Sequence, residues 1–182
     1  MPRPPHPPAT AYIGLGANLG DRAAALRQAV LGLASHPEVT VAGTSSIYET
    51  APHTLRPGER QPAYLNAVVQ VRTILPPRDL LALCHDLERR AGRRRPEARR
   101  WAPRPLDLDL LLYDERTCAT PGLTLPHPRL HERRFVLAPL AELAPDVRVP
   151  PPPAASAAEL LARCPDPDVP VRLAPLLTPA SP

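Results

Sequence analysis

The sequence predicts an α+β fold, a ferredoxin-like sandwich in which an antiparallel sheet carries helices packed on one face. The first reason is the element order read from hydrophobic periodicity, which is strand, helix, two strands, helix, strand. The second is the alternation of apolar and polar residues in the strand over residues 63–73 and around Leu106–Asp109, typical of strands with one buried face. Helices on one face would leave the other free for ligands.

The first half of the chain supplies a strand, a helix and a second strand. Residues 11–16 form an apolar, glycine-containing strand, and Asp21 is a suitable N-cap for an amphipathic helix over residues 23–33. Residues 39–50 are rich in Val, Thr, Ile and Tyr and predict the second strand. A proline-containing loop over residues 51–62 then leads to the next strand.

The second half begins with the alternating strand at 63–73 and a helix from about residue 76 to 91, which Gly92 ends. After a charged loop, the Asp-containing strand runs from residue 106 to 113. An extended piece is expected at residues 122–126. A largely helical stretch over 127–143 and a weaker helix over 154–163 complete the predicted elements.

Composition indicates one folded domain with proline-rich ends. Among 182 residues there are 29 prolines, and we expect a disordered leader at 1–9, a domain at 10–163 and a loosely packed proline-rich tail at 164–182. Three scattered cysteines without metal-site spacing fit a reducing cytoplasm. No stretch has the length of a membrane span. We expect no membrane partner and a monomer.

All of the basic excess is arginine. The net charge is +4 and the chain contains no lysine, which excludes a Walker-type phosphate loop because that loop needs a lysine. Eight arginines lie between Arg89 and Arg104, opposed there only by Glu97. Such a cluster predicts a polyanionic partner, either a nucleic acid or the phosphates of a nucleotide.

Asp107 and Asp109 are two residues apart in a predicted strand, so their carboxylates share one face while Leu106, Leu108 and Leu110 share the other. Mg²⁺ prefers oxygen ligands and takes one or two carboxylates together with substrate phosphates. Carboxylates beside an arginine cluster therefore indicate phosphoryl transfer. The alternative is a strand with a merely solvated polar face. The strand at 63–73 offers a comparable choice: Tyr64 and Asn66 together could hold a flat heterocycle, or simply face water.

Five segments together resemble 6-hydroxymethyl-7,8-dihydropterin pyrophosphokinases of folate biosynthesis. The most specific is the string Arg-Trp-Ala-Pro-Arg-Pro-Leu-Asp-Leu-Asp at 100–109, and the others, in the order expected for the family, lie at residues 11–20, 46–52, 61–67 and 125–135. The resemblance covers roughly residues 10–150. It implies transfer of pyrophosphate from ATP, the co-substrate, to the hydroxymethyl oxygen of the dihydropterin, with release of AMP.

The resemblance also implies roles for individual residues. Asp107 and Asp109 would hold two Mg²⁺ ions. The residues implied to act in catalysis are Arg93, Arg95, Arg104 and His127. Those implied to contact the nucleotide are Glu88, Arg104, Leu110, His127 and Arg133. Those implied to bind the pterin are Thr50, Tyr64, Asn66, Trp101 and Phe135.

The alternative function is an RNA-binding ferredoxin-like module that uses the arginines as a phosphate clamp. Such modules stack bases on aromatic residues of the open sheet face. This chain has one Trp, four Tyr and one Phe, and no strand is rich in them. Two carboxylates on the ligand face would also repel phosphate unless a metal ion lay between them. The sequence therefore favours the enzyme and no nucleic-acid partner.

Overall fold

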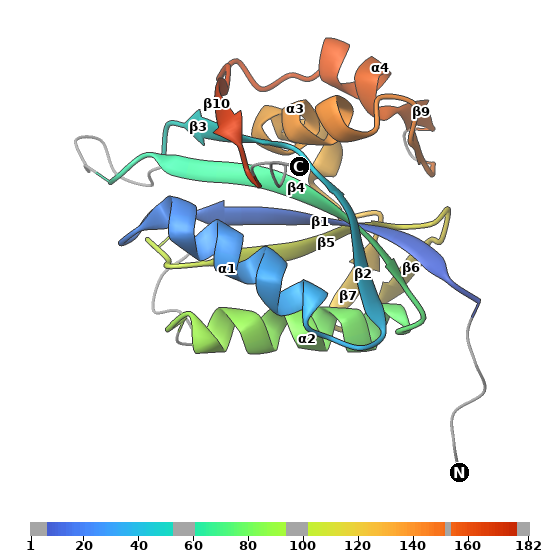
Figure 1. The fold of residues 1–182 in the computed structure, drawn as a ribbon. Helices are drawn as coiled ribbons and strands as arrows, with labels where there is room; N and C mark the ends of the chain where they lie inside the picture. The colour runs from blue at the N-terminus through green and yellow to red at the C-terminus, as the bar shows by residue number, and fades with distance from the viewer. Residues whose placement is uncertain (1–6, 53–60, 94–101, 152–153, 178–182) are drawn as a thin grey trace, which may run out of the picture.

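The computed structural model describes residues 7–52, 61–93, 102–151 and 154–177, and shows one central sheet between two layers of helices (Figure 1). The strand order is β10-β3-β4-β1-β5, with β2 also paired to β4. Every pairing in this sheet is antiparallel. The predicted α+β fold with an antiparallel sheet is confirmed.

The long central strands β1 (Ala9–Ala17) and β4 (Tyr64–Thr73) pair along their whole length, and β5 (Asp107–Tyr113) lies on the other side of β1. The predicted strand over 39–50 is two strands, β2 (Val39–Thr44) and β3 (Ser46–Thr50), both paired with β4. They part at Ser45, whose Oγ accepts from the Val68 N–H at 2.9 Å. A side chain thus satisfies the backbone where the strand breaks.

Helices α1 (Arg22–Ala34) and α2 (Pro77–Arg90) cover one face of the sheet, as predicted (Figure 1). Asp21 caps α1, since its Oδ1 accepts from the Ala24 N–H at 3.0 Å. The apolar sides of β1, β4 and β5 meet the two helices in a continuous core. Leu106, Leu108 and Leu110 lie in this core, so Asp107 and Asp109 face the opposite side, as the alternation predicts.

The expectation that helices pack on one face only is wrong. Helices α3 (Arg134–Leu143) and α4 (Ala157–Ala162) pack on the other face, against a second core that includes Val68 and Leu111 (Figure 1). The helix predicted over 127–143 begins only at Arg134, after a short 3₁₀ turn, Leu130–Glu132. Pro128 disfavours helical backbone at the preceding residue, His127, so a helix does not begin there. The opposite face is therefore open only in part.

Two short strand pairs complete the described structure. Strands β6 (Cys118–Thr120) and β7 (Leu123–Leu125) form a small hairpin, of which the sequence predicted only the second strand. Strands β8 (Arg148–Val149) and β9 (Ala155–Ser156) pair just before α4. In the described part of the chain, the helices are all too short or too polar to cross a membrane.

The expected loose packing of residues 164–182 is wrong for the described residues 164–177. Strand β10 (Val171–Pro175) adds to β3 at the sheet edge, and Cys164 and Leu176 are buried. The Leu176 carbonyl also accepts from Arg27 Nε of α1 at 3.2 Å. Proline-rich composition misled the prediction because prolines are tolerated in edge strands. The domain limits at residues 10 and 163 stay predictions.

Replacing Leu176 by Ala tests this packing. Leu176 is 0% exposed in the core beside α1, whereas Leu173, three residues earlier in β10, is 51% exposed. We expect Leu176→Ala to lower the free energy of unfolding by about 2–4 kcal/mol, as for other buried leucines, because a cavity remains. The matched Leu173→Ala should change it by less than about 0.5 kcal/mol. Urea unfolding followed by circular dichroism measures both, and equal effects would contradict the packing.

Candidate functional site

A cavity lies over the open part of the sheet, on the face away from α1 and α2. Its floor is formed by β1, β4 and β5, and α3 borders it. The residues predicted for the site that line it are Thr50, Tyr64, Asn66, Arg104, Asp107, Asp109, Arg133 and Phe135. These residues come from five parts of the chain. The fold thus brings together most of the predicted site residues that the structure describes.

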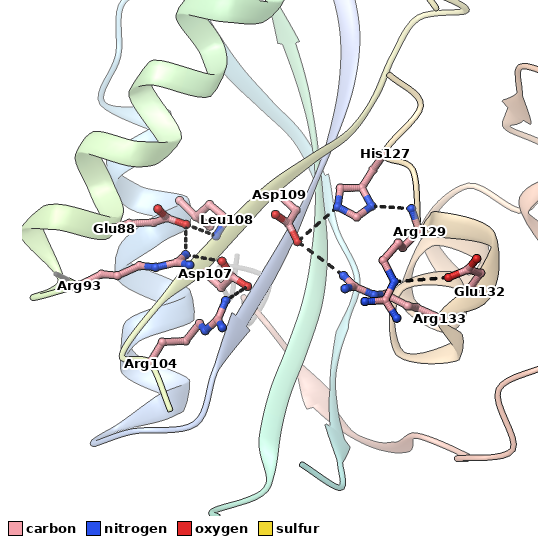
Figure 2. A network of polar contacts seen from close by, with 10 residues as sticks. All are labelled: Glu88, Arg93, Arg104, Asp107, Leu108, Asp109, His127, Arg129, Glu132 and Arg133. Atoms are coloured by element: carbon pink, nitrogen blue, oxygen red, sulfur yellow. Dashed lines mark hydrogen bonds and ion pairs between the residues drawn. The ribbon is translucent and has the colours of Figure 1, made fainter. Parts of the chain in front are cut away.

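Asp107 is held by two guanidinium groups (Figure 2). Arg104 NH1 donates to its Oδ2 at 2.9 Å, and Arg93 NH1 pairs with its Oδ1. Burial by itself raises the pKa of Asp107, but the charges of Arg104 and Arg93 outweigh it and hold that pKa below its ordinary value. Asp107 is therefore ionised at neutral pH.

Glu88 supports this arrangement from helix α2. It is 1% exposed on α2, and its Oε1 accepts from Arg93 NH1 and from the Leu108 N–H at 2.8 Å (Figure 2). Leu108 lies between the two aspartates, so Glu88 joins α2, Arg93 and the centre of β5. Glu88 and Leu110 are both buried and are not among the residues lining the cavity, which gives no support to direct nucleotide contact. That contact stays a prediction.

Asp109 lies further along β5 with a looser environment. Its side chain is 41% exposed, and His127 Nε2 and Arg133 NH1 lie 3.9 and 4.0 Å from its Oδ2 (Figure 2). Burial and then the negative charge of Asp107 raise the pKa of Asp109 to about 6, while Arg133 acts in the opposite direction. Asp109 thus carries a charge that the folded chain stabilises poorly.

His127 is uncharged at neutral pH. Burial and then the positive charge of Arg133 lower the pKa of His127 to about 4. Its Nδ1 accepts from the Arg129 N–H at 3.3 Å, so the proton of the neutral ring is assigned to Nε2, on the side of Asp109. His127 therefore presents a neutral N–H donor to this end of the site.

Another part of the cavity lining combines aromatic rings with amide and hydroxyl groups. Tyr64 and Phe135 line it from β4 and α3. Asn66 is 5% exposed and its Nδ2 donates to Thr50 Oγ1 at 2.8 Å, which fixes the orientation of the amide. The side-chain oxygen of Asn66, Oδ1, lies beside Gly16, where an added Cβ would come within 3.3 Å of it. A glycine therefore keeps this part of the floor open.

The donor set fits a hard divalent cation that brings other ligands with it. Asp107 and Asp109 offer carboxylate oxygens on one face of one strand, lining one cavity. Among the described residues, no three His, Cys, Asp or Glu gather into a group that could hold a metal. Two carboxylates with the remaining positions left to water and phosphate is the arrangement Mg²⁺ takes with nucleotides.

Two predicted residues, Arg95 and Trp101, lie outside the described residues. Conversely, the sequence analysis missed Asn18, which is 1% exposed at the end of β1. Its Oδ1 accepts from the Arg104 N–H at 2.8 Å and its N–H donates to the Arg104 carbonyl at 3.1 Å. Asn18 thus anchors the backbone of Arg104. Only its place inside a motif of the resemblance could have indicated this.

Comparison with known proteins agrees with the geometry. The family model described as 7,8-dihydro-6-hydroxymethylpterin-pyrophosphokinase matches residues 12–145. The 2-amino-4-hydroxy-6-hydroxymethyldihydropteridine pyrophosphokinase of Bacillus subtilis is 49% identical over 137 residues, which are 75% of this chain and 79% of that protein. The protein of the same name from Pseudomonas aeruginosa is 40% identical over 154 residues, which are 85% of this chain and 91% of that protein.

Solved structures support the fold. The crystal structure of Plasmodium falciparum HPPK-DHPS wild type with pteroate superposes with a TM-score of 0.68 at 13% identity. It covers 90% of this chain, whereas this chain spans only 43% of that longer one. The likeness therefore concerns the fold of this chain alone. None of the comparisons supports the RNA-binding alternative.

Proposed function

This chain belongs to the 7,8-dihydro-6-hydroxymethylpterin-pyrophosphokinase family, and we propose that it transfers a pyrophosphoryl group from ATP to the hydroxymethyl group of 6-hydroxymethyl-7,8-dihydropterin, releasing AMP, in folate biosynthesis. The observation that carries the proposal is the cavity itself. One cavity is lined both by the two aspartates with Arg104 and by Tyr64 with Phe135. A phosphate-handling end thus adjoins a slot suited to a flat ring.

The pterin occupies the end with the two rings. Tyr64 and Phe135 contact the faces of the heterocycle, which buries apolar area with a defined geometry. Thr50 Oγ1 accepts from Asn66, so its own hydrogen is available to an acceptor on the pterin edge. The fixed Asn66 amide is oriented for the same edge. The hydroxymethyl group then points along the floor of the cavity toward the aspartates.

The triphosphate occupies the end with the guanidinium groups. Arg93 and Arg104, which neutralise Asp107 in the structure, exchange that carboxylate for phosphate oxygens, a ligand to which arginine binds in a bidentate manner. Arg133 approaches from α3, and neutral His127 donates its Nε2 hydrogen to the nucleotide. For Arg95 we propose the catalytic role, and for Trp101 the pterin-binding role, that the family resemblance implies.

Asp107 and Asp109 would hold two Mg²⁺ ions along the triphosphate. Bound there, the ions would neutralise charge on the phosphates and align the reacting oxygens. The hydroxymethyl oxygen attacks the β-phosphorus, the bond from that phosphorus to the oxygen of the α-phosphate breaks, and AMP departs with that oxygen. The hydroxyl proton is lost to solvent. The positive groups around the cavity stabilise the charge that develops, and the rings hold the nucleophile in line.

The proposal also covers the oligomeric state, the cellular location and the binding partners. We propose that the chain acts as a monomer. Cysteines that are free in the described structure suit a reducing cytoplasm. ATP and the dihydropterin are the proposed binding partners.

Measurement of AMP tests the proposed function. The full chain with Mg²⁺ and ATP should release AMP only when hydroxymethyldihydropterin is present, one AMP per pterin consumed. A dihydropterin with a methyl group in place of the hydroxymethyl group lacks the nucleophile and should yield none. Absence of AMP with both substrates, or release of ADP instead, would refute the proposal.

A further inference from the structure

Helix α3 presents three cavity residues from its N-terminal end but has no cap of its own. Arg133, Phe135 and Val136 line the cavity, and Arg133 lies at the N-cap position without a side-chain hydrogen bond to the helix. The first N–H groups of a helix need partners from elsewhere. Whatever satisfies them also sets the direction in which Arg133 and Phe135 leave the helix.

The partner is the C-terminal segment. Asp166 Oδ2 accepts from the Arg134 N–H at 3.0 Å, and the Asp166 carbonyl accepts from Arg134 Nε at 2.9 Å. The Cys164 carbonyl takes a third hydrogen bond from Arg134 NH2 at 3.0 Å. A carboxylate at a helix N-terminus is favourable both as a cap and against the helix dipole. Arg134, between two cavity residues, is therefore clamped at three points.

The same segment holds the other end of α3. Arg172 NH2 donates to Glu142 Oε1 at 2.7 Å, and Glu142 also accepts from the Ser46 N–H at 3.1 Å. Burial by itself raises the pKa of Glu142, but hydrogen bonds from Ser46 and Tyr48 and the charge of Arg172 hold it below its ordinary value. From residue 134 to residue 142 a helix rises about 12 Å, and an extended chain from 166 to 172 reaches about 20 Å.

From Val171 the segment pairs as β10 with β3, and it ends with Leu176 buried beside α1. It thus passes from the α3 side of the sheet, around the edge, to the α1 side (Figure 1). The segment itself lies beyond residue 145, where the match to the family model ends. Residues 164–177, called the strap below, lie outside the region that the family model matches.

We propose that Asp166 is a positioning residue for the pterin and nucleotide cavity, which acts by clamping Arg134 and so fixes Arg133 and Phe135 on the first turn of α3. The identity of the ligands rests on the proposed function. The clamping of Arg134 by Asp166 is seen in the structure whatever the ligands are. Arg133 lies over the Phe135 ring at 5.6 Å and reaches Asp109 at 4.0 Å. A shift of this turn would therefore move one wall of the ring slot and one phosphate contact together.

The chain contains a single phenylalanine, which makes the test direct. Incorporation of 4-fluorophenylalanine labels Phe135 alone, and its ¹⁹F resonance reports the ring environment without any ligand. We expect Asp166→Ala to shift or broaden this resonance and to raise the dissociation constant for the dihydropterin about five- to tenfold, measured by calorimetry well below the melting temperature. The conservative Asp166→Asn keeps one acceptor for the Arg134 N–H and should stay within about twofold of the parent.

Asp168→Ala is the matched control, because it removes an exposed carboxylate two residues away in the strap. It should leave the resonance and the affinity unchanged. If Asp166→Ala lowers the melting temperature but changes neither the resonance nor the affinity, the strap is merely structural and the inference is wrong. If Asp166→Ala shifts the resonance but the parent chain releases no AMP, the proposed function is refuted. The positioning of Phe135 by Asp166 then still stands.

Discussion

Asp109→Asn is expected to reduce the rate of AMP release by at least about 10²–10³-fold while leaving the fold intact. This is the size of effect seen when one preorganised charge-stabilising group is removed from an active site. Asn keeps the shape of the side chain but supplies a weaker, uncharged metal ligand. No group closer than His127 Nε2, 3.9 Å away, forms an ion pair with Asp109 among the described residues, so folding does not depend on its charge.

The same substitution should keep or raise thermal stability. The pKa of Asp109 is raised to about 6, so the folded chain binds a proton more readily than the unfolded chain between about pH 4 and 6. By linkage, the ionised carboxylate of Asp109 is destabilising at neutral pH. Loss of activity together with unchanged or higher stability is the pattern of a charge retained for function.

Two comparisons make this result specific. Asp86→Asn on α2 removes a carboxylate whose ion pairs, among the described residues, are with the exposed Arg89 and Arg90, and this variant should release AMP normally. Asp107→Asn should lose activity and also stability, because it weakens the pairs with Arg93 and Arg104. Near-normal AMP release by Asp109→Asn would show that this carboxylate does not take part in the reaction.

The features that the sequence predicted correctly are those set by local periodicity. The alternation from Leu106 to Asp109 placed the leucines in the core and both aspartates on the ligand face, because successive side chains of a strand must alternate. The same rule placed Tyr64 and Asn66 together on the cavity side of β4. Asp21 as the cap of α1 is equally local.

The features that were missed depend on contacts between distant parts of the chain. Helix α3 covers part of the second face because Val68 and Leu111 are apolar there, yet their alternation alone does not say which element buries them. Proline-rich composition predicts a loose tail for the strap, although Leu176 and Arg172 each find a partner far away in sequence. The hydrogen bond between Asn18 and Arg104 likewise joins residues that are 86 positions apart in the sequence.

The ring slot supports the second large effect. Tyr64→Ala is expected to raise the dissociation constant for hydroxymethyldihydropterin by about 10- to 100-fold, because stacking on an aromatic side chain contributes about 1–3 kcal/mol per heterocycle. The affinity for a non-hydrolysable ATP analogue should change by less than about twofold. Tyr64 lies on β4 at the ring end of the cavity, whereas the arginines that would bind phosphate lie on the loop before β5 and before α3. Calorimetry measures both affinities.

Substitutions of Tyr64 and Phe135 distinguish effects on the ring slot from effects on phosphate binding. Tyr64→Phe keeps the stacking surface and should bind the pterin within about twofold of the parent. Phe135→Ala should weaken pterin binding as Tyr64→Ala does, but Arg133 lies over the Phe135 ring, so this variant alone should also lower the ATP affinity slightly. Equal losses of both ligands in Tyr64→Ala would mean that Tyr64 supports the cavity as a whole. Selective loss of the pterin would place the heterocycle against the Tyr64 ring, with its hydroxymethyl group directed toward the aspartates.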